Sequence, residues 1–240
     1  MKIIQITDTH LMPHGTNLHG LNPCERLEAC ISSINEFHAD AELCFITGDL
    51  TDQGHRKAYH DLREIFRQLK MPYHPLIGNH DHREIFTEVF PEVPLDEHGF
   101  VQQMLATEQG RFLLLDTVEH GKHWGSYCEK RGDWLRKQLK DAGSDAVYLF
   151  MHHPPFNIGI PSLDFLNLKN DAKRVQEIVC DFSNIKHLFF GHVHRPVSGS
   201  WHGIPFTTLR GTNHQFQLDL NAVDYLPYSH EPPAYCVIFL

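Results

Sequence analysis

Aspartate, asparagine and histidine residues recur at the ends of five short apolar runs. The runs, with the polar groups that close them, read IIQITDTH, LCFITGD, YHPLIGNH, VYLFMHH and LFFGHVH. The polar residues are Asp8, His10, Asp49, Asn79, His80, His152, His153, His192 and His194. Carboxylate, imidazole and amide groups are ligands for divalent ions such as Mn, Fe, Zn and Co. The recurrence therefore predicts a metal site in preference to a nucleophilic triad.

Strands are needed to bring these groups together. Continuous apolar runs are typical of strands that are buried on both faces of a sheet. Strands are expected at residues 2–6, 43–47, 73–77, 111–116, 147–151 and 187–190. Sites in α/β sheets form outside the carboxyl ends of the strands, so the polar groups converge if these strands are neighbours. Side chains two residues apart on an extended segment share one side, so His192 and His194 are expected to point together.

Segments with helical spacing lie between the expected strands. The first helix is expected to begin with Asn22 as N-cap, Pro23 and Glu25. Its apolar stripe consists of Leu27, Cys30, Ile31, Ile34 and Phe37. Further helices are expected at residues 56–69, 83–90, 134–142 and 172–182. This alternation of strands and helices predicts an α/β layered fold.

The composition suits one large globular domain. The chain has 240 residues, 41% of them hydrophobic, and shows no linker or internal repeat. A single domain is expected over 1–240, in which residues 197–240 contribute extra strands and substrate-pocket loops. The closing run AYCVIFL is typical of a strand.

Charge and targeting signals exclude several classes of protein. The net charge of −9, with no basic stripe, argues against general nucleic-acid binding. No apolar run approaches the length that crosses a membrane, and no signal peptide is apparent. The six cysteines form no CxxC pair and are expected to be reduced thiols. A cytoplasmic protein is expected.

The polar groups are too numerous for one ion. Two ions about 3.5–4 Å apart would clamp a phosphoryl group and generate a bridging hydroxide from water. Asp49 is the expected bridging carboxylate. Two dications outweigh the charges of Asp8, Asp49 and a hydroxide, so such a centre would attract an anion although the protein is negative.

Each motif taken alone also has a purely structural interpretation. TDTH is compatible with a helix cap, GNHD with a turn, and HHPP with a proline-terminated strand. GHVHRP is more suggestive of a metal site. The agreement of five strand ends favours a shared metal centre.

The order D-x-H, G-D, G-N-H, H-H and G-H-x-H resembles the calcineurin-like metallophosphoesterase superfamily. The segments ITDTHL, GNHDHREIF, MHHPPFNIG and GTNHQF are most similar to class III cyclic-nucleotide phosphodiesterases and bacterial glycerophosphodiesterases. The resemblance implies a four-layer α-β-β-α sandwich with mixed sheets, the metallophosphoesterase fold, and a dinuclear centre at one end.

The resemblance also implies residue roles. One ion would be held by Asp8, His10 and His194, the other by Asn79, His152 and His192, with Asp49 bridging both. His80 would lie over the phosphate and assist the leaving alkoxide, or alternatively orient a ligand. Substrate contacts are expected from Asn79, His80 and His214. Manganese or iron is expected first, with zinc and cobalt as alternatives.

The expected reaction is hydrolysis of a small phosphodiester by the metal-bridging hydroxide. A 3′,5′-cyclic nucleotide is the first candidate, and 2′,3′-cyclic nucleotides or glycerophosphodiesters are alternatives. A non-catalytic scaffold on the same fold is a candidate from a different class, and a nuclease is disfavoured by the negative charge. No membrane partner is expected, and a homo-oligomer is left open.

Overall fold

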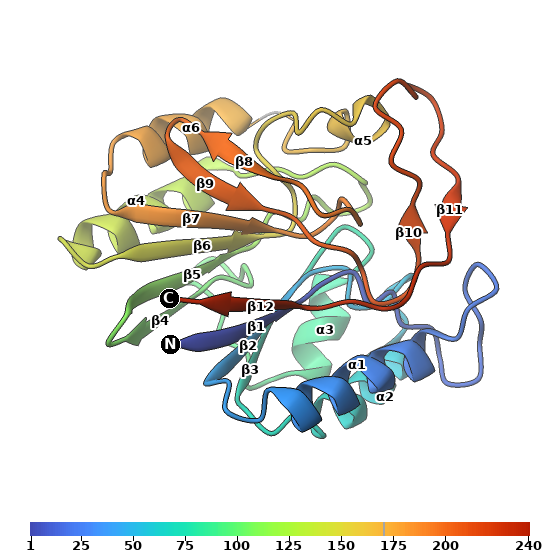
Figure 1. Ribbon diagram of the computed structural model, residues 1–240. Helices are drawn as coiled ribbons and strands as arrows, with labels where there is room; N and C mark the ends of the chain where they lie inside the picture. The colour runs from blue at the N-terminus through green and yellow to red at the C-terminus, as the bar shows by residue number, and fades with distance from the viewer. Residues whose placement is uncertain (170) are drawn as a thin grey trace.

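The computed structural model describes residues 1–169 and 171–240 and contains two main β-sheets (Figure 1). The first sheet has the order β12 (Cys236–Phe239), β1 (Lys2–Ile6), β2 (Leu43–Thr47) and β3 (Tyr73–Leu76). Strands β1, β2 and β3 are parallel, and β12 pairs antiparallel with β1. The C-terminal run thus forms the strand that the sequence predicts.

The second sheet contains six strands and is also mixed. Its order is β4 (Gln103–Thr107), β5 (Gly110–Leu115), β6 (Val147–Met151), β7 (Ile185–Phe190), β9 (Ile204–Thr207) and β8 (Ser198–Trp201). Strands β5, β6, β7 and β9 are parallel, whereas β4 and β8 run antiparallel at the two edges. A separate two-stranded ribbon joins β10 (Gln215–Phe216) to β11 (Tyr228–Ser229).

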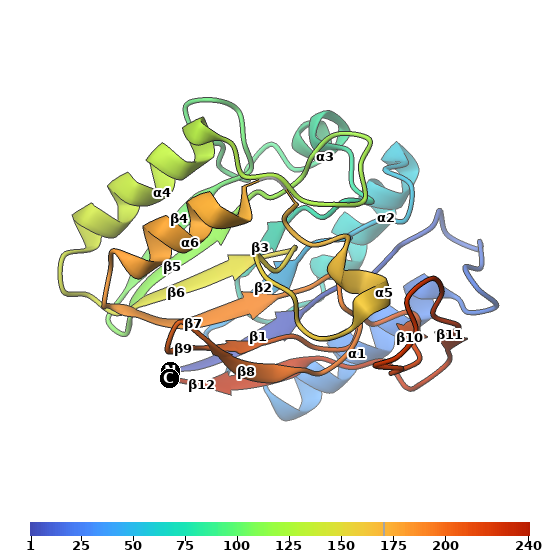
Figure 2. The same ribbon diagram turned by 90° about the horizontal axis from the view of Figure 1, so that it is seen from above.

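Helices cover the outer face of each sheet (Figures 1 and 2). The first sheet carries α1 (Pro23–Phe37), α2 (Arg56–Phe66) and α3 (Arg83–Val89). The second sheet carries α4 (Glu129–Ala142) and α6 (Ala172–Cys180). The short α5 (Pro161–Asp164) lies next to the β10–β11 ribbon. No helix of residues 1–169 and 171–240 is both long and apolar enough to cross a membrane.

Three hydrophobic cores correspond to the three contacts between layers. Buried residues of α1, α2 and α3 pack on the first sheet, and those of α4 and α6 pack on the second. The core between the sheets consists of Ile3, Phe45, Leu76, Phe112, Leu114, Phe150 and Phe189. Its rings pack closely, with centroid distances of 4.3 Å for Phe45–Phe150 and 4.6 Å for Phe150–Phe189. The predicted four-layer α-β-β-α sandwich is confirmed.

Helix α1 shows how the sequence pattern was right and where it failed. The Asn22 side chain accepts hydrogen bonds from the backbone N–H groups of Cys24 and Glu25, which confirms the predicted cap. The prediction that Phe37 belongs to the buried stripe is wrong. Phe37 is the last residue of α1 and is 64% exposed, since the buried stripe ends one turn earlier at Ile34.

The other predicted helices and strands are present with ends shifted by a few residues, and two elements were not anticipated. Helix α5 has only four residues, too few for a periodic pattern. Strand β4, with the sequence QMLAT, lies at a sheet edge, and Met104 on it is exposed. Its side chains therefore lack the continuous apolar character of the central strands.

The five strands that precede the polar motifs end at the same end of the sandwich (Figure 1). Strands β1, β2 and β3 are neighbours in the first sheet, and β6 and β7 are neighbours in the second. Because parallel neighbours share a direction, their carboxyl ends meet at one edge of each sheet.

Candidate metal centre

Backbone hydrogen bonds continue between the loops beyond the strand ends. Asp8 N–H donates to the Gly48 carbonyl over 3.0 Å, and His10 N–H donates to the Asp49 carbonyl over 2.9 Å. The two sheets are joined directly, because the backbone N–H of His192 donates to Oδ1 of Asp8 over 3.1 Å. The loops of both sheets therefore form one unit around the Asp8 carboxylate.

Several of the expected ligands have a left-handed backbone. Asp8, His10, Asp49, His192 and His194 have φ angles of 51°, 44°, 48°, 68° and 52°. This conformation is unfavourable for residues other than glycine and persists only where surrounding contacts enforce it. The extended conformation expected for His192 and His194 is wrong, because both residues have a left-handed backbone, but both side chains reach the same site beyond the strand end, as expected. Their imidazoles enter two different groups of side chains.

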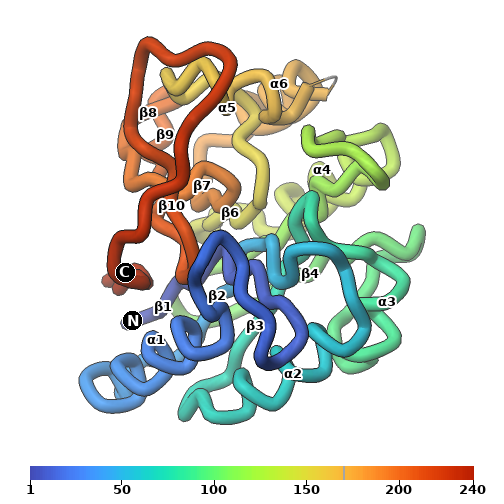
Figure 3. The backbone as a smooth tube through the Cα atoms, turned by 90° about the vertical axis from the view of Figure 1, so that its right-hand side faces the viewer, coloured from blue at the N-terminus to red at the C-terminus, as the bar shows by residue number. Residues whose placement is uncertain are grey.

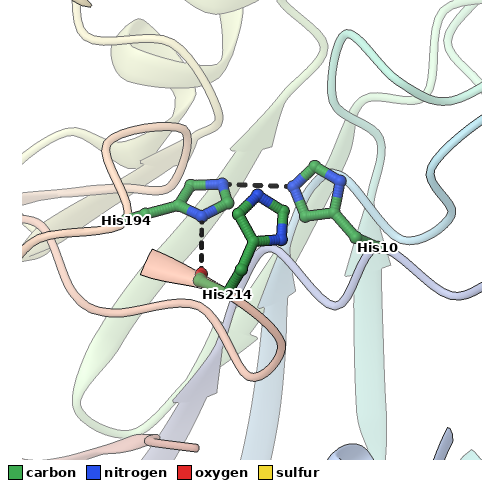
Figure 4. A group of neighbouring side chains, drawn as sticks. All are labelled: His10, His194 and His214. Atoms are coloured by element: carbon green, nitrogen blue, oxygen red, sulfur yellow. Dashed lines mark hydrogen bonds between the residues drawn. The ribbon is translucent and has the colours of Figure 1, made fainter. Parts of the chain in front are cut away.

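The first group brings together Asp8, His10, Asp49 and His194, all of them buried. Nε2 of His10 and Nε2 of His194 lie 3.1 Å apart (Figure 4). Nε2 of His194 is 3.4 Å from Oδ1 of Asp8, and Nε2 of His10 is 3.6 Å from Oδ2 of Asp49. One atom from each of the four side chains lies within 4.8 Å of all the others.

The second group lies on the other side of Asp49. Oδ1 of Asn79 is 3.2 Å from Nε2 of His152 and 3.1 Å from Nδ1 of His192. Oδ2 of Asp49, the oxygen that faces His10, is also 3.3 Å from Nε2 of His152. Asp49 therefore stands between the two groups. The fully buried His153 adjoins this group, and its Nδ1 is 2.8 Å from Oγ1 of Thr117.

Three of the imidazoles are oriented by oxygen atoms behind them. The contacts of Nδ1 are His10 to Asp52 Oδ1 at 3.2 Å, His152 to the Thr47 carbonyl at 2.8 Å, and His194 to the His214 carbonyl at 2.9 Å. Figure 4 shows the last of these contacts. A ring that donates from Nδ1 in its neutral form has a lone pair on Nε2, which is the atom that faces the centre in each case.

Glycine residues, which have no side chain, allow the close approach of these loops. At Gly48, where φ is +96°, a Cβ atom would overlap the His152 ring. At Gly78, a Cβ would overlap both the carboxylate and the backbone nitrogen of Asp49. The glycines before the polar residues are therefore required by space at both positions and by backbone conformation at Gly48.

The carboxylates of the centre remain ionised. Burial would raise the pKa of Asp49, but the imidazoles of His152, His80 and His10 hold it well below its usual range. Burial would lower the pKa of His152, but Asp49 and Asp8 outweigh it and raise this pKa to about 9. Two buried carboxylates need positive charge beside them, which either protonated histidine or divalent ions supply.

The residues present fit a pair of divalent ions. In their neutral forms His10 and His194 direct two lone pairs at each other over 3.1 Å, an arrangement that a cation between them would stabilise. Within residues 1–169 and 171–240, Oδ2 of Asp8 and Nε2 of His192 are buried and have no hydrogen-bond partner. Two carboxylates, four imidazoles and an amide match the ligand preferences of such ions.

The two remaining predicted site residues lie beside the centre. The backbone N–H of His80 donates to Oδ1 of Asp49 over 2.9 Å, and its Nδ1 is 2.8 Å from the Asp52 carbonyl. Burial lowers the pKa of His80, but Asp49 and then Asp52 outweigh it, so that this pKa lies above its ordinary value. The ring of His214 lies 4.9 Å from that of His10 and 4.7 Å from that of His194, between centroids (Figure 4).

A pocket of about 90 Å³ opens over both groups. Its lining includes the predicted residues His10, Asp49, Asn79, His80, His192, His194 and His214. It also includes residues that were not predicted from the sequence, namely His19, Asp52, His123, Leu163, Leu166, Phe216 and Tyr228. The sequence could have pointed to Asp52 as a site residue, because it follows Asp49 by three residues in GDLTDQG. Phe216 closes the segment GTNHQF, whereas His19, His123, Leu163, Leu166 and Tyr228 lie outside the recognised motifs.

A four-layer sandwich with aspartate and histidine side chains at the strand ends of both sheets is the expected arrangement of a metal-dependent phosphoesterase. The sequence profile described as "Calcineurin-like phosphoesterase" matches residues 1–196. The chain belongs to the calcineurin-like phosphoesterase family, which confirms the resemblance found in its motifs.

Similar proteins agree with this assignment. The chain is 41% identical over 239 residues to a probable cyclic nucleotide phosphodiesterase of Rhodopseudomonas palustris, covering 98% of this chain and 86% of the relative. It is 31% identical over 236 residues to a probable glycerophosphodiester phosphodiesterase of Arcobacter nitrofigilis, with the same coverage of 98% and 86%. A dimetal phosphatase from Danio rerio shares the fold, with a TM-score of 0.70, 15% identity, and coverage of 88% and 87%.

Divalent ions should stabilise the fold because they balance the buried carboxylates. Saturating Mn²⁺ should raise the midpoint of thermal unfolding by about 5–10 °C over a chelated sample. The Asp49→Asn variant, whose amide also tolerates the left-handed backbone, should show a much smaller rise. Differential scanning calorimetry measures both proteins. An unchanged midpoint for the parent protein, or equal rises in both proteins, would contradict this assignment of Asp49.

Proposed function

We propose that this chain hydrolyses a small phosphodiester at the metal centre, with a 3′,5′-cyclic nucleotide as the first candidate substrate. The proposal depends chiefly on one observation: two groups of metal-ligand side chains share Asp49 at the floor of a single pocket. The family and the 41% identity to a protein named as a probable cyclic nucleotide phosphodiesterase support the reaction and the substrate class.

We assign the ligands as the two groups suggest. Asp8, His10 and His194 would hold one ion, Asn79, His152 and His192 the other, and Asp49 both. Manganese or iron is our first expectation for the ions, with zinc or cobalt as alternatives, because the donor set suits all four metals. When bound, such a pair would lower the pKa of the attacking water and offset charge that develops on the phosphoryl oxygens.

The side chains of the pocket would supply the remaining chemistry. His80 is 30% exposed in its side chain and has its Nδ1 held by the Asp52 carbonyl, so Nε2 is the atom available to a substrate. This atom would be placed to donate a proton to a leaving alkoxide. Asn79 and His214 line the same pocket and would contact the substrate beside the reacting phosphate.

Two alternative diester substrates stay open. The 31% identity to a protein named as a probable glycerophosphodiester phosphodiesterase favours glycerophosphodiesters as the second candidate. A 2′,3′-cyclic nucleotide presents the same monoanionic phosphodiester to the centre. A nuclease acting on long nucleic acids is disfavoured by the net charge of −9. A non-catalytic scaffold is disfavoured because all seven expected ligand positions carry ligand-type side chains.

We propose that residues 1–240 act as one catalytic unit. Strand β12 pairs with β1, and Phe216 and Tyr228 of the ribbon line the pocket, so the segment after residue 197 supports both the fold and the site. The cytoplasmic location stays a prediction, and a homo-oligomer stays open. All six cysteines are free thiols, which is compatible with a reducing compartment.

A substrate comparison tests the proposed function. Protein reconstituted with Mn²⁺ is assayed with 3′,5′-cyclic AMP, 2′,3′-cyclic AMP and glycerophosphoethanolamine, and kcat/KM is measured for each. We expect 3′,5′-cyclic AMP to be preferred and the activity to disappear on chelation. Preference for glycerophosphoethanolamine would establish the second candidate instead, and absence of turnover with two ions bound would favour the scaffold.

The role of His80 is tested by His80→Ala. General acid–base groups typically contribute about 10²–10⁴-fold, so kcat should fall by at least about 100-fold while two metal ions per chain are retained. The exposed His120 lies outside the pocket, and His120→Ala should keep the parent kcat. Both kcat and metal content are measured. A loss of metal that matches the loss of activity would place His80 among the ligands.

A further inference from the structure

The pocket has an aromatic wall formed by His19, Phe216 and Tyr228. The rings of His19 and Tyr228 are stacked, with centroids 3.6 Å apart and planes at 24°. The rings of Phe216 and Tyr228 are nearly parallel at 5.6 Å and 29°. His19 covers one face of the Tyr228 ring, Tyr228 is 41% exposed, and His19 and Phe216 are half-buried, so the wall as a whole is partly open to the solvent.

The aromatic wall begins directly beside the metal centre. The ring of His214 contacts His10 on one side and Tyr228 on the other, with centroid distances of 4.9 and 5.0 Å. The ring of Phe216 lies 4.9 Å from that of His194. A phosphate held at the centre would therefore place an adjoining sugar and base toward this wall.

Backbone contacts hold the aromatic wall in position. Phe216 and Tyr228 are paired directly across the β10–β11 ribbon, which rises beside α5 in Figure 3. His19 lies in a tight turn closed by reciprocal hydrogen bonds between Leu18 and Leu21, of 2.8 and 3.0 Å. The φ angles of His19 and Gly20 are 51° and 81°, as expected for the two central residues of such a tight turn.

Apart from His123, whose ring lies 5.6 Å from that of His80, the rest of the pocket lining is apolar or lies in or beside the metal centre. Leu163 and Leu166 line it near α5, and Leu163 also packs in one cluster with Val193 and Leu226. Among the described residues that line the pocket there is no lysine or arginine. Beyond the centre, the pocket thus offers mainly flat aromatic and apolar surface, and neither a lysine nor an arginine for a second phosphate group.

We infer that the aromatic wall binds the base of a nucleoside cyclic monophosphate by stacking, and that it sets the preference for nucleotides over glycerol-based diesters. This inference rests on the proposed phosphodiesterase function and names the part of the substrate that the pocket recognises. Every nucleobase has a flat π-face, whereas a glycerol headgroup has none. Stacking of one base on an aromatic side chain contributes about five- to 150-fold in affinity.

The inference is tested by the selectivity of Tyr228→Leu and His19→Asn. Asparagine removes the ring of His19 but tolerates its left-handed backbone. We measure kcat/KM for 3′,5′-cyclic AMP and for glycerophosphoethanolamine with Mn²⁺-loaded protein. Each variant should lower the ratio of the two values by about tenfold, chiefly through a higher KM for cyclic AMP. The separate variant Tyr228→Phe keeps the aromatic ring and should have the same ratio as the parent protein.

A matched control is Tyr225→Leu, since Tyr225 lies in the same ribbon segment, is 67% exposed and does not line the pocket. It should leave both kcat/KM values unchanged. Calorimetric binding of adenosine and of ribose to each protein gives a second readout that needs no turnover. Adenosine should bind the parent more tightly than ribose and lose this advantage in Tyr228→Leu.

The outcomes separate the inference from the proposed function. Diester hydrolysis with an unchanged substrate ratio in Tyr228→Leu and His19→Asn would overturn the inference and leave the function intact. An equal loss on both substrates would also overturn it. If no diester is hydrolysed, the proposed function fails, and the adenosine measurement still decides whether the aromatic wall binds a base.

Discussion

The end of the molecule that holds the candidate site depends on one close contact. Nε2 of His10 and Nε2 of His194 lie only 3.1 Å apart. Each ring has its Nδ1 held from behind, by Asp52 and by the His214 carbonyl, so the Nε2 atoms cannot turn away. The carboxylates of Asp8 and Asp49 are buried beside them. Such a group of electron-rich atoms is costly inside a protein unless positive charge lies among them.

This constraint joins the two halves of the sandwich. Asp8 follows a strand of the first sheet and accepts the backbone N–H of His192 from the second, while Asp49 accepts the backbone N–H of His80. The left-handed backbones of five expected ligands are unfavourable alone and are enforced by these bonds between loops. The centre is therefore preorganised: its ligands are positioned by the fold itself, as precise metal geometry requires.

The features that could be predicted from the sequence are those that depend on neighbouring residues along the chain. Central strands have apolar runs because both of their faces are covered, so the fold was recognisable. The polar residues that follow those runs directly could be named as seven candidate ligands. The left-handed conformations of His192 and His194 could not be predicted from the sequence, because contacts between distant loops determine them. The stacking of His19 on Tyr228 joins residues more than 200 positions apart, and neither residue belongs to a motif. Strand β4 was missed because an edge position does not require a continuous apolar run.

The central claim is that Asp49 bridges two ions at the shared floor of the pocket. The most direct measurement is anomalous diffraction at the manganese absorption edge, from crystals of the protein loaded with Mn²⁺. We expect two peaks about 3.5–4 Å apart on either side of the Asp49 carboxylate, one near His10 and His194 and the other near Asn79 and His152. A single peak, or two peaks without Asp49 between them, would contradict the account.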